Sequence, residues 1–169
     1  MASTGDPGDL YRAIGVKPII NAFGTNTRFG GSKLRPEAIE AMNKAATINV
    51  EVDELNRVAG RIIAEHTGAE AGFVSSGSAG GLFLQAAACI AGSDPAQMAR
   101  LPNTTGMKNE IIIHRSHRFP YDQMYCAAGA KMVDIGDGRR CAPWQLEAAF
   151  TERTAAVAYL VSPFVSRRA

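Results

Sequence analysis

The amino-acid sequence predicts an α/β fold built on a mainly parallel sheet. Three short apolar runs, at residues 110–114, 131–135 and 155–161, have the length and composition of buried strands. Helical segments separate these runs, and strands that alternate with helices form βαβ units whose strands pair in parallel. Ligands of such sheets bind beyond the carboxyl ends of the strands, so residues that follow a strand are the first candidates for a site.

Residues 1–50 are expected to form an N-terminal arm, a loop and a helix. A short helix at 9–14 precedes Gly15, and an extended piece is expected at 18–20. Residues 21–32 are rich in turn formers and indicate an irregular loop. Pro36 then begins a helix at its first position, where the missing N–H group costs nothing.

Residues 51–169 are expected to form part of a larger domain. The clearest helix covers 53–67, because apolar residues recur there every three or four positions and Gly68 supplies the end. The remaining elements are expected in the order strand 71–75, helix 78–91, polar loop 101–109, strand 110–114, helix 121–128, strand 131–135, helix 143–150 and strand 155–161.

The composition indicates a globular protein without an electrostatic surface for nucleic acid. Of the 169 residues, 46% are hydrophobic and 20% are charged, which is enough apolar material for a core. The 18 basic and 16 acidic residues give a net charge of +2 and are spread along the chain. A length of this size suits one domain, or one large part of a bigger protein.

The cysteine pattern and the N-terminus predict a cytoplasmic protein. Cys89, Cys126 and Cys141 are widely spaced and odd in number, which is typical of free thiols in a reducing compartment. The first residues are polar and lack the apolar core of a signal peptide. The longest apolar stretch, 82–91, is far shorter than the ~20 residues that span a bilayer.

The loop between the expected strand 71–75 and helix 78–91 is a candidate anion site. Ser76, Gly77 and Ser78 combine two hydroxyl groups with a flexible turn at a helix start, where unpaired N–H groups attract a phosphate. Dinucleotide-binding and P-loop fingerprints are absent from it. The same residues also suit an ordinary tight turn from a strand into a helix.

His117 is the second candidate, because it lies just beyond the strand that ends at His114. At the carboxyl edge of the sheet, an imidazole can stack on a flat ring or move a proton. The alternative is a histidine that only makes hydrogen bonds in its loop.

Several runs resemble pyridoxal-phosphate (PLP) enzymes of the aspartate-aminotransferase fold. They include Asp53-Glu-Leu-Asn56, Thr67-Gly-Ala-Glu-Ala71 and Val74-Ser-Ser-Gly-Ser-Ala79. Within that fold the chain is most similar to the bacterial selenocysteine synthase (L-seryl-tRNA(Sec) selenium transferase) family. The likeness covers essentially residues 10–166.

Two departures point within this family to the subgroup of D-glucosaminate-6-phosphate ammonia-lyase. Selenocysteine synthases carry a tRNA-binding domain, for which no room precedes Leu10, and an Asn-rich phosphate loop in place of Ser-Ser-Gly-Ser. The runs at 106–110 and 117–122 are more similar to the lyase subgroup. We therefore expect a small-molecule amino acid or amino sugar as the substrate, and no tRNA or membrane partner.

The resemblance implies a site in which PLP is the cofactor and residues 51–169 form part of its large domain. Ser76, Gly77 and Ser78 match the loop that holds the cofactor phosphate. His117 matches the position that stacks on the pyridine ring, with His114 as the alternative. Thr25 and Arg28 are expected to meet the substrate, although Arg28 also suits a solvated loop. The intact protein is expected to be a homo-oligomer.

The resemblance places the lysine that would bind PLP covalently beyond Ala169, together with the aspartate that would hold the pyridine nitrogen. None of the lysines present matches that position: Lys17, Lys33, Lys44, Lys108 and Lys131. No catalytic residue is therefore assigned, and the chain is expected to be an N-terminal fragment of a lyase or transferase that eliminates or replaces a leaving group. An inactive α/β fragment and a nucleotide-binding α/β domain are the alternatives.

Overall fold

The computed structural model describes residues 5–161 and divides the chain into two compact units. The first unit is Met1–Leu55 and the second is Asn56–Ala169. Within the described residues, no helix is long and apolar enough to cross a membrane.

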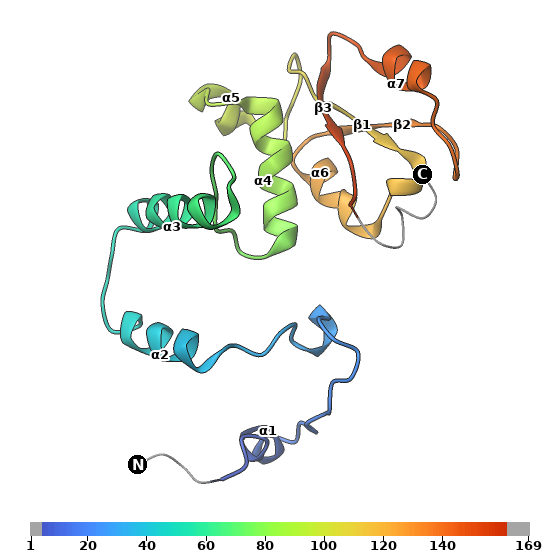
Figure 1. The fold of residues 1–169 in the computed structure, drawn as a ribbon. Helices are drawn as coiled ribbons and strands as arrows, with labels where there is room; N and C mark the ends of the chain where they lie inside the picture. Colours follow the sequence, from blue (N-terminus) through green and yellow to red (C-terminus); the bar gives the residue numbers. More distant parts are fainter. Residues whose placement is uncertain (1–4, 162–169) are drawn as a thin grey trace. The chain divides into compact units, whose positions relative to one another are not determined.

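The first unit contains two helices and a long loop. Helix α1 (Asp9–Ala13) and helix α2 (Pro36–Ala45) confirm the two helices expected there (Figure 1). The loop between them includes a single 3₁₀ turn, Thr27–Phe29, and residues 18–20 form no strand. None of the described residues in this unit is buried, so its local structure rests on hydrogen bonds and helix propensity rather than on a core.

The second unit is built on a parallel sheet with the order β2-β1-β3. Strand β1 (Glu110–His114) lies in the centre, flanked by β2 (Lys131–Ile135) and β3 (Thr154–Ala158). Ile112 of β1 pairs with Val133 on one side and with Val157 on the other. The α/β fold with a parallel sheet is therefore confirmed, and its strands are those that the apolar runs predicted.

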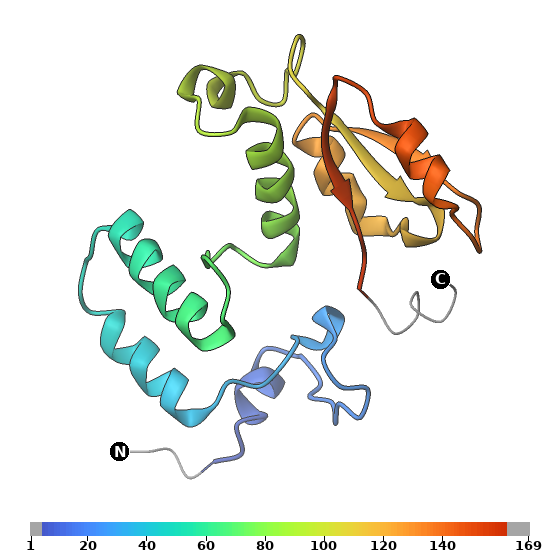
Figure 2. The same ribbon diagram turned by 45° about the horizontal axis from the view of Figure 1, so that its top comes forward.

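Helices cover both faces of this sheet. Helix α4 (Ser78–Ala91) and helix α6 (Gln123–Ala127) pack on one face, where Ala86, Ile111 and Ala128 form a buried cluster (Figures 1 and 2). Helix α7 (Pro143–Ala149) lies on the other face. The connections from β1 to β2 and from β2 to β3 run in opposite directions across the sheet. Right-handed crossovers then place α6 and α7 on opposite faces.

The expected strand at 71–75 is wrong, although the segment is extended. Within residues 5–161 no strand pairs with it, and the side chain of Asn56 makes its backbone hydrogen bonds instead. The Asn56 amide donates to the carbonyl oxygen of Val74 at 2.9 Å and accepts its N–H at 3.1 Å. This reciprocal pair ties the segment to helix α3 (Val52–Thr67), which matches the expected helix at 53–67.

The third strand is also shorter than expected, since β3 ends at Ala158 and not at Val161. Its last pairing joins Ala158 to Ile113, one residue before the central strand ends. Helix α5 (Pro95–Arg100) is capped by Asp94, whose carboxylate accepts the N–H of Ala96 at 2.8 Å.

We predict that Gly60→Ala destabilises the second unit by about 1–3 kcal/mol, because the added methyl group overpacks a backbone contact. Gly60 lies in α3 against the backbone of Gly72, and a Cβ atom there would collide with the Gly72 carbonyl oxygen. Urea unfolding followed by circular dichroism measures the change. Gly138→Ala is the control, since a Cβ atom at Gly138 meets nothing within 4 Å. Equal stability of both variants would contradict this contact.

Candidate functional site

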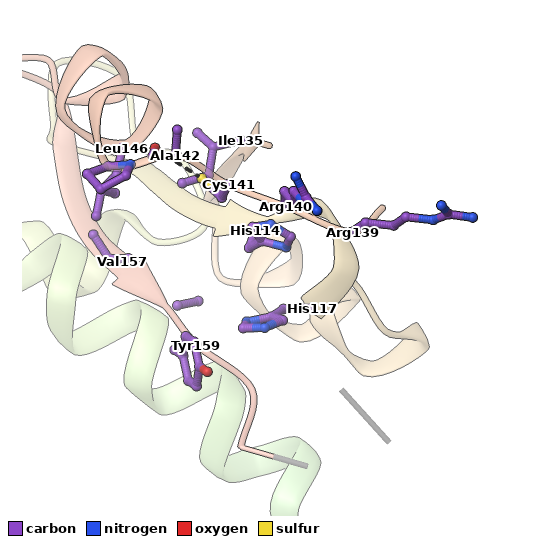
Figure 3. A pocket seen from close by; sticks show the side chains of 12 residues that line it. His114, His117, Ile135, Arg139, Arg140, Cys141, Ala142, Leu146, Val157 and Tyr159 are labelled. Atoms are coloured by element: carbon purple, nitrogen blue, oxygen red, sulfur yellow. Dashed lines mark hydrogen bonds between the residues drawn. The ribbon is translucent and has the colours of Figure 1, made fainter. Parts of the chain in front are cut away.

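A cavity of about 600 Å³ lies at the carboxyl edge of the sheet. All three strands contribute to it where they end: His114 from β1, Ile135 from β2, and Ala158 with Tyr159 from β3. Figure 3 shows this arrangement, with side chains from the segment before α7 and from α7 itself closing one side. The edge predicted to carry the ligand is therefore hollowed in the folded chain.

His117 lies in this cavity and is nearly inaccessible, with 2% of its surface exposed. It ends the 3₁₀ turn Arg115–His117 that follows β1 directly. Its Nδ1 accepts the N–H of Leu160 at 3.4 Å, and the rings of His117 and Tyr159 form a T-shaped pair with centroids 4.3 Å apart. Burial, and then the charge of nearby His114, lower the pKa of His117 below its usual value of 6.5.

His114 lies beside His117, with ring centroids 5.2 Å apart. The backbone N–H of Ser116 donates to His114 Nδ1 at 3.0 Å, and the Ser116 hydroxyl lies 2.5 Å from the same nitrogen. An imidazole nitrogen that accepts a hydrogen bond carries no proton. The neutral form of His114 therefore holds its hydrogen on Nε2.

An ion-pair network fixes the loop that carries His117. Arg118 donates through Nε to Asp122 and through Nη1 to Asp134 of β2, at 2.7 Å for the second contact. The Asp122 carboxylate is buried and also accepts the N–H of Phe119 at 3.4 Å. Hydrogen bonds to Asp122 and then to Asp134 raise the pKa of Arg118. The loop after β1 is thus tied to β2.

Sequence reasoning assigned no role to this network. Arg118 and Asp122 are four residues apart in the run His-Arg-Phe-Pro-Tyr-Asp, a spacing that permits an ion pair within a helical turn. That spacing is the only signal available in the sequence. The contact with Asp134 depends on the pairing of β1 with β2, which joins residues far apart in the chain.

The loop at 76–78 lies at the N-terminal end of α4. Gly77 has a φ of +101°, which favours glycine, and no side chain caps the first turn of the helix. Figures 1 and 2 show that α4 begins on the same side of the sheet on which β3 ends. Ser76, Gly77 and Ser78 do not belong to the residues that line the cavity.

Thr25 and Arg28 belong to the first unit. The Thr25 hydroxyl lies 3.5 Å from the hydroxyl of Ser32. The backbone N–H of Arg28 donates to the side chain of Asn26 at 2.9 Å, which caps the 3₁₀ turn there. The structure places these two residues in one loop of the first unit.

The fold and the cavity together define an α/β domain with a small-molecule-sized hollow at the strand ends. No family model matches the chain. It is 35% identical over 158 residues to D-glucosaminate-6-phosphate ammonia lyase of Salmonella typhimurium, a match that covers 91% of this chain and 43% of that protein. It is 34% identical over 164 residues to 5'-C-glycyluridine monooxygenase-decarboxylase of a Streptomyces species, covering 94% and 41%.

A solved structure supports the same relationship. The structure of D-glucosaminate-6-phosphate ammonia-lyase matches with a TM-score of 0.88 and 34% identity, over 95% of this chain and 44% of that one. The chain therefore has the fold of a part of that protein. It spans less than half the length of the curated relatives it matches. The relatives are a lyase and a monooxygenase-decarboxylase, and neither carries the name selenocysteine synthase.

We predict that Arg118→Met destabilises the chain by about 2–4 kcal/mol, because it leaves the buried carboxylate of Asp122 without its cation. Asp134→Asn is the matched variant and is expected to cost under about 1 kcal/mol, since Asp134 is more exposed. Urea unfolding measures both. Similar losses of unfolding free energy for the two variants would contradict the conclusion that the buried Asp122 carboxylate is the more important partner of Arg118.

We predict that His117 makes stability depend on pH on the acidic side. Its pKa is lower in the folded chain than in the unfolded chain, so the unfolded state binds more protons below about pH 6.5. The free energy of unfolding should fall as the pH drops from that value toward the folded pKa. NMR titration of the ring gives the pKa, and His117→Asn should flatten the pH dependence. A ring pKa at or above 6.5 contradicts the lowered value.

Proposed function

We propose that this chain is the cofactor-holding portion of a PLP-dependent lyase or transferase that acts on an amino acid or amino sugar by elimination or replacement. The observation that carries the proposal is the buried His117 at the end of the central strand, in a chain that superposes on part of a D-glucosaminate-6-phosphate ammonia-lyase. The sequence of this chain resembles the selenocysteine synthase family. Its ammonia-lyase subgroup is the better candidate, because the relatives above include that lyase.

The residues of the second unit have the chemistry that PLP requires. The uncapped start of α4 offers backbone N–H groups and the hydroxyls of Ser76 and Ser78 to a phosphate, with Gly77 making the turn. The imidazole of His117 is proposed to stack on the pyridine ring, which requires the exposed side chain of Tyr159 to move aside, because His117 is only 2% exposed. When bound, PLP supplies an electron sink for the substrate carbon. The part of this chain is to bind the cofactor, orient its ring and exclude water from one side.

Substrate contacts are proposed for the first unit. Thr25 and the guanidinium of Arg28 are suited to a carboxylate or a phosphate, because a guanidinium binds both through paired hydrogen bonds. The lysine and the aspartate that complete such a site are assigned to sequence beyond Ala169. We propose a homo-oligomer in the cytoplasm as the state of the intact protein, with no tRNA partner.

The second relative supports a second reaction class on the same site. A monooxygenase-decarboxylase that shares 34% identity over 94% of this chain carries the same half of the fold. The cofactor-holding portion is therefore compatible with more than one fate of the substrate. The portion of the protein that this chain does not contain would select between elimination and oxidative decarboxylation.

We predict that the full chain binds PLP reversibly. Equilibrium dialysis should give saturable binding, with Ser76→Ala weakening it about tenfold through the loss of a charge-assisted hydrogen bond. Ser93→Ala is the control, because Ser93 is exposed in the turn beyond the other end of α4. Pyridoxal without its phosphate should bind more weakly than PLP.

Two outcomes of that experiment would overturn the proposal. Displacement of PLP by NAD or ATP at similar affinity would instead indicate a nucleotide-binding domain. Failure of PLP to saturate the chain would indicate a fragment without a cofactor site. After borohydride treatment, we expect no lysine of this chain to carry the cofactor. Recovery of a labelled peptide containing Lys108 or another lysine would place the covalent link within residues 1–169.

A further inference from the structure

The polar side chains of the cavity at the carboxyl edge are hydrogen-bond donors. Among the described residues, the lining contains no Asp, Glu, Asn or Gln, and its walls are apolar, with Ile135, Leu146 and Val157 among them. The polar members are His114, His117, Arg139, Arg140, Cys141 and Tyr159. A ligand that fills this space therefore meets many donors and few competing acceptors.

The two histidines of the cavity have the same nitrogen engaged. Nδ1 of His117 accepts the N–H of Leu160, and Nδ1 of His114 accepts the N–H of Ser116. Both rings in their neutral form therefore hold a hydrogen on Nε2. Both rings line the cavity, with centroids 5.2 Å apart, so Nε2–H is the donor that each ring has left for a ligand.

A short turn between β2 and α7 holds two arginines at the same cavity. The Asp137 carboxylate accepts the N–H of Arg139 at 2.6 Å and that of Arg140 at 2.8 Å, and the Asp137 N–H donates to the Arg140 carbonyl at 2.9 Å. These backbone bonds, that from Arg140 first, lower the pKa of Asp137. Asp137 thus fixes the backbone of the turn.

The guanidinium groups of this turn are available to a ligand. Over residues 5–161, no ion pair or hydrogen bond engages the guanidinium of Arg139 or of Arg140. Figure 3 shows the Arg139 side chain extending away from the imidazoles, which leaves Arg140 as the better placed of the two. The Asp137 carboxylate of the turn interacts electrostatically with Arg139 and with His114, which again leaves Arg140 as the better candidate. A guanidinium beside apolar walls attracts an anion.

We propose that this cavity binds an oxyanion of the substrate, a phosphate ester or a carboxylate, through the guanidinium of Arg140 and the Nε2–H groups of His114 and His117. The inference deepens the proposed function and rests on it for the identity of the ligand as substrate. The apolar walls would hold the carbon skeleton. The cofactor phosphate is assigned to a separate place, the start of α4, so the two anions do not compete.

The test uses the full chain without PLP, labelled with ¹⁵N in its histidines, and inorganic phosphate as the probe. We expect the ring nitrogens of His114 and His117 to show the Nε2–H form, and phosphate to shift them saturably. Arg140→Gln should weaken phosphate binding about tenfold, the usual worth of a charge-assisted hydrogen bond. Arg61→Gln is the matched control, because Arg61 is an exposed arginine on α3, away from this cavity.

Acetate and D-glucosamine 6-phosphate, used as probes, distinguish a carboxylate ligand from a phosphate ester. Arg140-dependent shifts with acetate support a carboxylate ligand, and tighter binding of the sugar phosphate than of glucosamine supports a phosphate ester. Equal affinity of Arg140→Gln and Arg61→Gln for both anions would overturn the proposal, as would a proton on Nδ1 of both rings.

Failure of this inference can be told apart from failure of the cofactor site. PLP binding to Arg140→Gln, measured by dialysis, should match that of the unsubstituted chain. Normal PLP binding with no anion binding in the cavity would overturn the inference alone. Anion binding with no PLP binding would overturn the proposed function and leave an anion-binding cavity whose ligand is no longer a substrate of PLP chemistry.

Discussion

The burial of the central strand is the constraint on which the rest of the second unit depends. Ile111, Ile112 and Ile113 are at most 2% exposed, and burying each side chain contributes about 1.5–3 kcal/mol. Their burial requires a neighbouring strand on each side and a helix on each face. Because both neighbours run parallel to β1, all three strands end at the same edge of the sheet.

Charged groups secure both ends of that strand. At its start, the buried carboxylate of Glu110 accepts hydrogen bonds from Thr151 at 2.7 Å and from Arg153 at 2.6 Å, and these lower its pKa. At its end, Arg118 joins the following loop to Asp134 of β2. The first clamp ties β1 to the segment before β3, and the second ties it to β2. The position of His117 is therefore set by the sheet rather than by its own loop alone.

The sequence predicted those parts that depend on local pattern. The strands β1 and β2 and helix α4 follow from apolar runs, and the structure confirms them. The segment 71–75 has strand-like composition as well, yet strand structure requires a partner at the right distance, and Asn56 occupies that place. Such pairing is a property of the folded chain, which local composition does not contain.

The candidate site likewise combines residues that local sequence places with residues that only long-range pairing places. His117 could be predicted because a residue just after a parallel strand lies at the ligand edge whatever the rest of the fold does. Arg140 could not, because its place beside the histidines depends on the crossover from β2 to β3. Leu160 could not either, since its N–H group reaches His117 only when β3 pairs with β1. Long-range pairing therefore assembles the donors that local sequence leaves apart.

The neutral state of His117 makes its ring compatible with the guanidinium of Arg140 in the same cavity. A protonated imidazole would repel the guanidinium of Arg140 across apolar walls, where charges are weakly screened. Burial lowers the pKa of His117, so the ring donates through Nε2–H without adding a second positive charge. Its Nδ1 is engaged by the N–H of Leu160, so Nε2 is the nitrogen from which the neutral ring can donate. The fold that buries His117 therefore sets both the charge of the ring and the position of its donor.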